Sequence, residues 1–162
     1  MMMTSGGGRN WRLVRADTDA VPSSVRRFMA RARKRKLQAA LRTLRDVAGD
    51  GRLLVVFQPY RVYRTRDLQA ELAEGLALAD EVVVMEVFGP GEVRGPGEGG
   101  VALTAAIDLS ADRKVFVPSW ADVPAEVVRR SRPGDVVVTM GAPPISLMGD
   151  ELLAALAEAD GL

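Results

Sequence analysis

The sequence contains no cysteine and no histidine among its 162 residues. Without cysteine there is no disulfide, no thiolate nucleophile and no cysteine-based metal site. Without histidine the chain lacks the commonest general base near neutral pH and the commonest metal ligand, so we expect no metal site. Any chemistry must therefore come from carboxylates, lysine, tyrosine, serine, threonine, arginine or a bound partner.

Long apolar segments are missing as well. No run reaches the roughly 18 apolar residues of a membrane-spanning helix. The N-terminal stretch MMMTSGGGRN lacks the apolar core of a secretory signal. We therefore expect a cytoplasmic protein without a membrane partner. Hydrophobic residues still make up 48% of the chain and charged residues 27%, which is the balance of a globular domain with a modest core.

Charge is distributed unevenly along the chain, although its net value is only +1. Residues 1–48 hold 12 Arg and Lys against 3 Asp and Glu, whereas residues 49–162 hold 10 against 18. Such a basic arm can fold back on the acidic body or bind an anionic partner. Few aromatic side chains that could stack on bases lie near it, which disfavours nucleic acid as the partner. The arm also leaves a homodimer open, because it could pair with a second copy.

The chain divides into three predicted parts. Residues 1–21 predict a flexible tail with a short strand at 11–15, residues 22–50 a basic helical arm, and residues 51–162 an α/β domain. In the last part, short apolar runs predict buried strands at 53–57, 81–87, 114–117 and 135–140. The intervening segments favour helices at 66–78, 101–107, 121–130 and 145–157. This alternation predicts a Rossmann-like three-layer domain, with a mostly parallel sheet covered by helices on both faces.

The loop after the first apolar strand carries a cluster of cationic and phenolic side chains. In the segment FQPYRVYRTRDL, residues 57–68, these are Tyr60, Arg61, Tyr63, Arg64 and Arg66. Ligands of parallel sheets bind beyond the carboxyl ends of the strands, and arginine forks match carboxylate and phosphate groups. Thr65 is the expected N-cap of the next helix, whose exposed amides offer further anion contacts. The segment therefore predicts an anion site, and the alternative is a solvated, charged loop.

Three blocks of the sequence carry a family resemblance. FQPYRVYRTRDL resembles the FQPHRYxRTRDL block in the C-terminal domain of the Mur ligases of cell-wall synthesis, in the type that adds L-alanine. Residues 77–92, ALADEVVVMEVFGPGE, resemble the LxxADEVVLxDVYxAxE block, and residues 118–142 resemble the PGDLVLTxGAG block with its flanks. Because order and spacing also match, the combination is much more specific than any one motif.

The resemblance implies a function for the loop. The family's three-domain enzymes activate a carboxylate with ATP and then form an amide with an amino acid, which the C-terminal domain helps to bind. By resemblance, Arg61 and Arg64 hold the amino acid's carboxylate, and Tyr60 stands where the family has a histidine. Supporting positions are Thr65, Arg66, Asp17 and Gly141. No G-x-x-x-x-G-K-[ST] phosphate loop is present, so ATP and magnesium are expected only with a partner domain.

The sequence also departs from the family pattern. The best counterpart of the family's DDYxHHPTE signature is ADTDAVPSS, residues 16–24, which keeps Asp17 and Pro22 but neither histidine. The family's GAG becomes GAP, and the pair Pro143-Pro144 stiffens the loop and removes two backbone donors. Two interpretations stay open: a ligase module that acts with a partner supplying the ATP and acceptor sites, or a pseudoenzyme that binds a small anion or a protein. No catalytic residue is assigned.

Overall fold

The fold is a parallel sheet with helices on both faces. The computed structural model describes residues 12–15 and 34–160. Within these ranges it holds a 5-stranded sheet in which every neighbouring pair is parallel. In spatial order the strands are β1 (Arg12–Arg15), β5 (Val136–Gly141), β2 (Leu53–Gln58), β3 (Glu81–Met85) and β4 (Lys114–Val117). The predicted Rossmann-like three-layer α/β fold is confirmed.

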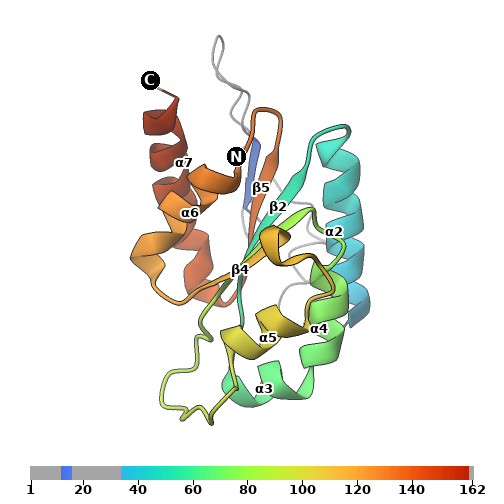
Figure 1. The fold of residues 1–162 in the computed structure, drawn as a ribbon, viewed down its shortest axis with the longest axis vertical. Helices are drawn as coiled ribbons and strands as arrows, with labels where there is room; N and C mark the ends of the chain where they lie inside the picture. Colours follow the sequence, from blue (N-terminus) through green and yellow to red (C-terminus); the bar gives the residue numbers. More distant parts are fainter. Residues whose placement is uncertain (1–11, 16–33, 161–162) are drawn as a thin grey trace.

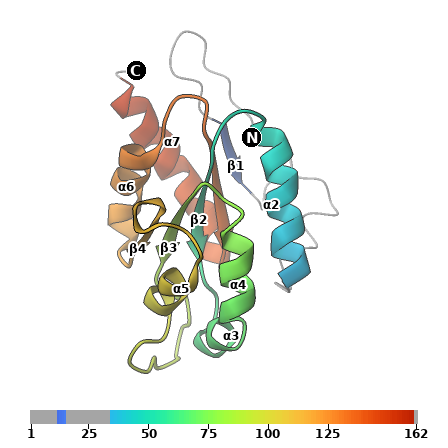
Figure 2. The same ribbon diagram turned by 45° about the vertical axis from the view of Figure 1, so that its right-hand side comes forward.

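The central strands are buried on both faces, because each face is covered by a helical layer (Figures 1 and 2). One layer holds α2 (Lys34–Ala48), α4 (Gln69–Leu76) and α5 (Gly100–Ala106). The other holds α6 (Val123–Arg130) and α7 (Met148–Ala159). Alternate residues of β2 therefore face different cores: Val55 lies with the first layer and Val56 with the second.

The segment after β2 folds differently from the prediction. It forms α3 (Val62–Asp67) and then α4, in place of one helix from residue 66. The N-cap of α3 is Arg61, so the prediction that Thr65 caps the helix is wrong. Thr65 lies inside α3, where its hydroxyl donates to the Arg61 carbonyl at 2.8 Å. Shorter elements complete the described chain: η1 (Ala111–Arg113), η2 (Trp120–Asp122) and η3 (Pro143–Leu147).

The described part of the basic N-terminal segment belongs to the same core. Leu37 and Leu41 of α2 are buried, and Leu37 packs so closely on Gly75 of α4 that a Cβ there would come within 2.8 Å of its Cδ2. Gln38 donates to Glu74 at 3.2 Å across the same contact. The core therefore includes residues before position 51, the position at which the sequence predicts the α/β domain to begin. Residues 16–33 of the predicted tail and arm lie outside the described residues.

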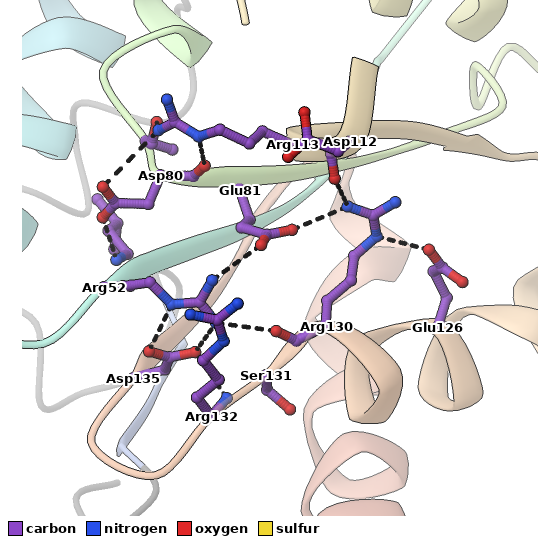
Figure 3. A network of polar contacts seen from close by, with 12 residues as sticks. Arg52, Asp80, Glu81, Asp112, Arg113, Glu126, Arg130, Ser131, Arg132 and Asp135 are labelled. Atoms are coloured by element: carbon purple, nitrogen blue, oxygen red, sulfur yellow. Dashed lines mark hydrogen bonds and ion pairs between the residues drawn. The ribbon is translucent and has the colours of Figure 1, made fainter. Parts of the chain in front are cut away.

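An ion-pair network closes the end of the sheet where the strands begin (Figure 3). Arg52 donates a hydrogen bond to Glu81 at 2.8 Å and two hydrogen bonds to Asp135, at 2.7 and 3.1 Å. Arg130 donates to the other oxygen of Glu81 at 2.8 Å, so one carboxylate joins both guanidinium groups. The side chains of Asp135 and Arg130 keep only 3% and 8% of their exposure. We assign this end of the sheet to stability.

No helix in the described ranges has the length and apolar character needed to cross a membrane.

Candidate functional site

The candidate site lies at the opposite end of the sheet, where β2 and β3 finish beside α3 (Figure 1). The two strands continue their pairing through an isolated bridge between Tyr60 and Phe88. Phe88 donates its amide to the Pro59 carbonyl at 2.9 Å, and its carbonyl accepts from the Arg61 amide at 3.0 Å. The rings of Tyr60 and Phe88 stack, with centroids 6.3 Å apart and planes at 18°. These contacts fix the aromatic base on which the cations lie.

Arg61 has an unusual backbone. Of the described non-glycine residues it alone has a positive φ, at 67°. Such a conformation costs of order 1–3 kcal/mol and persists where surrounding contacts hold it. Here the Arg61 carbonyl accepts from both the amide and the hydroxyl of Thr65, which is 1% exposed. The buried Thr65 thus supports the site from inside the helix, and the Arg61 side chain stays 35% exposed.

Two guanidinium groups share the ring of Tyr60. The Cζ atoms of Arg61 and Arg64 lie 5.3 and 5.8 Å from its centroid, within the range of cation–π attraction. Arg64 also lies 5.9 Å from the ring of Tyr63 and donates to its hydroxyl at 3.4 Å. Over the part of the chain that the structure describes, Arg64 has no carboxylate within 4 Å, and the nearest to Arg61 is Glu92 at 4.0 Å. Both guanidinium groups therefore keep donors available for an incoming anion.

The start of α3 already holds a carboxylate from the protein itself. The Val62 amide donates to Glu92 Oε2 at 3.1 Å. Gly89 makes room for this contact, because a Cβ at that position would lie 2.5 Å from the same oxygen. The first amide of α3 is therefore occupied by the protein's own Glu92, and residue 66, where the sequence predicts the helix to begin, lies inside α3. An external anion would therefore bind to the arginine side chains.

The loop that bears Glu92 is anchored at both ends. Glu86 accepts from the amides of Val87 and Gly100, at 2.8 and 3.0 Å, and pairs with Arg94. Burial alone would raise the pKa of Glu86, but these donors outweigh it and hold the pKa below its usual range. Glu98 accepts from the Gly95 amide at 2.8 Å. The loop is thereby held against the site.

Arg66 does not join the two arginines on Tyr60. It pairs with Asp67 at 3.1 Å and approaches Glu98 at 3.6 Å. Its side chain lines a shallow depression between α4 and α5, together with Asp67, Asp108 and several alanines. Arg66 was predicted to support the site because it lies in the same segment, but its position on α3 turns its side chain toward this depression.

Gly141 ends β5 next to the last residue of β2. It has a φ of 124°, and a Cβ there would lie 2.0 Å from the Gln58 carbonyl oxygen. That carbonyl accepts from the Ala142 amide at 2.8 Å, so glycine lets the η3 turn close on β2. Beneath it, Gln58 Oε1 and Thr139 Oγ1 are buried without a hydrogen-bond partner among the described residues. Asp17, the last predicted supporting residue, lies outside the described residues.

Phe88 and Glu92 also lie at the site, although neither was predicted as a binding residue. Both follow β3, the neighbour of β2 in the sheet. The rule that binding residues lie beyond the carboxyl ends of adjacent strands is the signal that could have found them. In the described ranges no three carboxylates gather closely enough to hold a metal ion.

Comparison with known proteins shows the family of this chain. The family model described as "Mur ligase, glutamate ligase domain" matches residues 32–143. The chain belongs to the Mur ligase family. A UDP-N-acetylmuramate–L-alanine ligase from Salinispora arenicola is 74% identical over 117 residues, and one from Acidothermus cellulolyticus is 54% identical over 107. These matches cover 72% and 66% of this chain but only 23% and 22% of those proteins.

Solved Mur ligase structures share the fold. The UDP-N-acetylmuramate-alanine ligase of Thermotoga maritima superposes with a TM-score of 0.66 at 18% identity, over 97% of this chain and 29% of that one. A domain of a ligase for UDP-N-acetylmuramate and L-alanyl-γ-D-glutamyl-diaminopimelate from Haemophilus ducreyi gives a TM-score of 0.61 at 20% identity. This superposition covers 97% of this chain and 100% of that domain. The chain thus spans about a quarter of the length of the curated Mur ligases that it matches.

Proposed function

We propose that this Mur ligase domain binds the carboxylate of an amino acid at Arg61 and Arg64. The amino acid is then presented to partner domains that supply the ATP and acceptor sites for amide-bond formation. The observation that carries the proposal is the pair of guanidinium groups on Tyr60, neither of which has a carboxylate of a described residue within hydrogen-bonding distance. Charge-assisted bonds from such forks orient a carboxylate as well as holding it.

The relatives support the amino acid as ligand. The matched proteins from Salinispora and Acidothermus are named as ligases that join UDP-N-acetylmuramate to L-alanine. The family match includes residues 57–68 of this chain, so we extend the alanine-binding role to this segment. ATP and magnesium belong to the proposed partner, because the chain has no phosphate-loop motif of its own. The proposed complex acts in the cytoplasm.

A second function is a non-catalytic module that binds a small anion or a protein. The observation that favours it is the chain's lack of histidine, including at Tyr60, where the family has one. This alternative uses the same two arginines but needs no partner ligase. The two functions therefore differ in whether binding leads to an amide.

Ligand binding is tested by thermal unfolding of the full chain with L-alanine, other amino acids, ATP and UDP-sugars. A ligand that binds only the folded state raises the melting temperature. Loss of either arginine removes a charge-assisted contact, so Arg61→Ala and Arg64→Ala should weaken L-alanine binding about tenfold or more. Arg42→Ala, an exposed arginine on α2, is the matched control and should bind as the wild type does. Equal responses from all four proteins would rule out the arginine site.

Catalysis is tested by adding the chain to the first two domains of the Salinispora ligase, with ATP, L-alanine and UDP-N-acetylmuramate. The ligase interpretation expects amide product and phosphate release that depend on Arg61 and Arg64. Binding of L-alanine without any product would instead favour the non-catalytic module.

A further inference from the structure

We propose that Glu92 recognises the ammonium group of the ligand, so that the site selects α-amino acids over simple carboxylates. The inference rests on the proposed function and adds the residue that sets its specificity. It starts from the position of the Glu92 carboxylate, whose Oε2 lies 4.0 Å from Arg61 Nη1. A cation and an anion thus lie side by side at the edge of the site.

The Glu92 carboxylate is held in place without being used up. Its Oε2 accepts from the Val62 amide at 3.1 Å, and its own amide donates to the Gly89 carbonyl at 3.0 Å. No hydrogen bond from a described residue reaches Oε1, and the side chain keeps 21% of its exposure. One oxygen therefore fixes the side chain, and the other is open to a ligand.

The other two carboxylates of this loop are closed in a way that Glu92 is not. Glu86 uses one oxygen for two amides and the other for Arg94. Glu98 uses one oxygen for the Gly95 amide and faces Arg66 with the other. Glu92 is thus the member of this loop whose second oxygen has no cationic partner among the described residues.

Arg61 is equally open. The distance of 4.0 Å to Glu92 is too long for a hydrogen bond, and its contact with the Pro90 carbonyl is long as well, at 3.5 Å. An α-amino acid carries its two charges one carbon atom apart, so it can bond to both groups at once. A carboxylate that lacks the ammonium would bring a second negative charge next to Glu92, with nothing to offset the repulsion.

The test measures binding of L-alanine and of propionate, which has the same carboxylate and carbon chain without the ammonium. Full-length wild type and Glu92→Gln are titrated with each by calorimetry. The amide oxygen of glutamine still accepts from Val62, so the start of α3 is kept while the charge is lost. Hydrogen bonds to a charged group contribute enough that we expect L-alanine to bind the variant about tenfold more weakly. Propionate should bind it as well as, or better than, the wild type.

Glu98→Gln is the matched control, since it removes a charge from the same loop and should leave the ratio of the two affinities unchanged. Unfolding curves without ligand establish that both variants are folded. A ratio of affinities that is the same in wild type and Glu92→Gln would overturn the role of Glu92. If Arg61→Ala and Arg64→Ala also left the affinity for L-alanine unchanged, or if L-alanine did not bind at all, both the proposed function and the inference would be wrong.

Discussion

The two ends of the sheet hold their arginines in different ways. Where the strands begin, Arg52 is bonded to two carboxylates, and Asp135 behind it is almost fully buried (Figure 3). Where the strands end, Arg61 and Arg64 lie on the ring of Tyr60, and within the described ranges no carboxylate is in hydrogen-bonding distance of either. Arginine therefore stabilises the fold at one end of the sheet and is available to a ligand at the other.

The difference has a physical cause. A guanidinium group that is enclosed between buried carboxylates offsets their desolvation, and removing it leaves charge buried without a partner. A guanidinium group on a half-buried aromatic ring such as that of Tyr60 is held by weaker attraction and keeps its donors available. Exchangeable contacts are what a binding site needs, and permanent ones are what a fold needs. Variants at each end should separate these two roles.

The largest expected effect comes from breaking the network at the beginning of the strands. Arg52→Ala leaves Asp135 and Glu81 without their shared cation, so we expect a loss of about 3 kcal/mol in the free energy of unfolding. The value lies at the low end for buried pairs because the Arg52 side chain is 25% exposed, which lets water reach the carboxylates. Urea unfolding measures it.

Arg129→Ala is the matched control on α6. Its side chain is 64% exposed, and it pairs with Glu126 at the surface. Exposed pairs of this kind contribute about 1 kcal/mol or less. A loss for Arg52→Ala no greater than that of the control would show that the network is not a stabilising feature.

A smaller loss is expected from Gly141→Ala at the end of the strands. The new Cβ would meet the Gln58 carbonyl oxygen, and alanine avoids the φ of this position, so we expect a loss of about 2 kcal/mol after local relaxation. Gly49→Ala separates the two causes, since its φ of 56° is also positive but no atom of a described residue lies within 4 Å of a Cβ at that position. It should cost about 1 kcal/mol. Equal losses in urea unfolding would mean that the close approach to Gln58 plays no part.

The sheet was predictable because its strands are buried on both faces. Runs such as LLVVF and DVVVTM leave no polar face, which is typical of parallel strands under two helical layers. The position of β1 was not predictable in the same way. Nothing local in RLVR says that this strand pairs with β5, more than a hundred positions later in the sequence, rather than with β2. Pairing order depends on contacts that are distant in sequence.

The candidate site was predictable only as a segment. Its arginines stood out because they follow a buried strand, and the family resemblance gave them a role. The start of α3 was missed, because long-range bonds from Phe88 and Glu92 begin the helix at Val62, whereas Thr65 resembles a local N-cap. Because α3 begins at Val62, Arg64 and Arg66 both lie within it, and side chains two positions apart on a helix point in different directions. Charge patterns in one segment cannot show which carboxylate of another segment will face them.

Acid should weaken both ends of the sheet, though by smaller amounts than the substitutions above. Asp80 accepts from the Leu53 amide at 2.7 Å and pairs with Arg45. Burial alone would raise the pKa of Asp80, but these donors outweigh it, so the pKa lies below its usual range, as it does for Glu86. A carboxyl group with a lowered pKa in the folded state stabilises the fold above its ordinary pKa. That stability is lost as pH falls through the folded value. The loss should therefore begin below about pH 4.5.

Urea unfolding between neutral pH and about pH 3 tests this at each end separately. Asp80→Asn should reduce the loss of unfolding free energy in acid that arises where the strands begin. Glu86→Gln should reduce the loss that arises in the loop beside the ligand site. Asp46→Asn, an exposed carboxylate on α2, should leave the curve as in the wild type. If Glu86→Gln changes acid stability but not L-alanine binding, the loop is anchored by Glu86 independently of the ligand. If it changes both, the anchoring of the loop is part of what holds Glu92 beside Arg61.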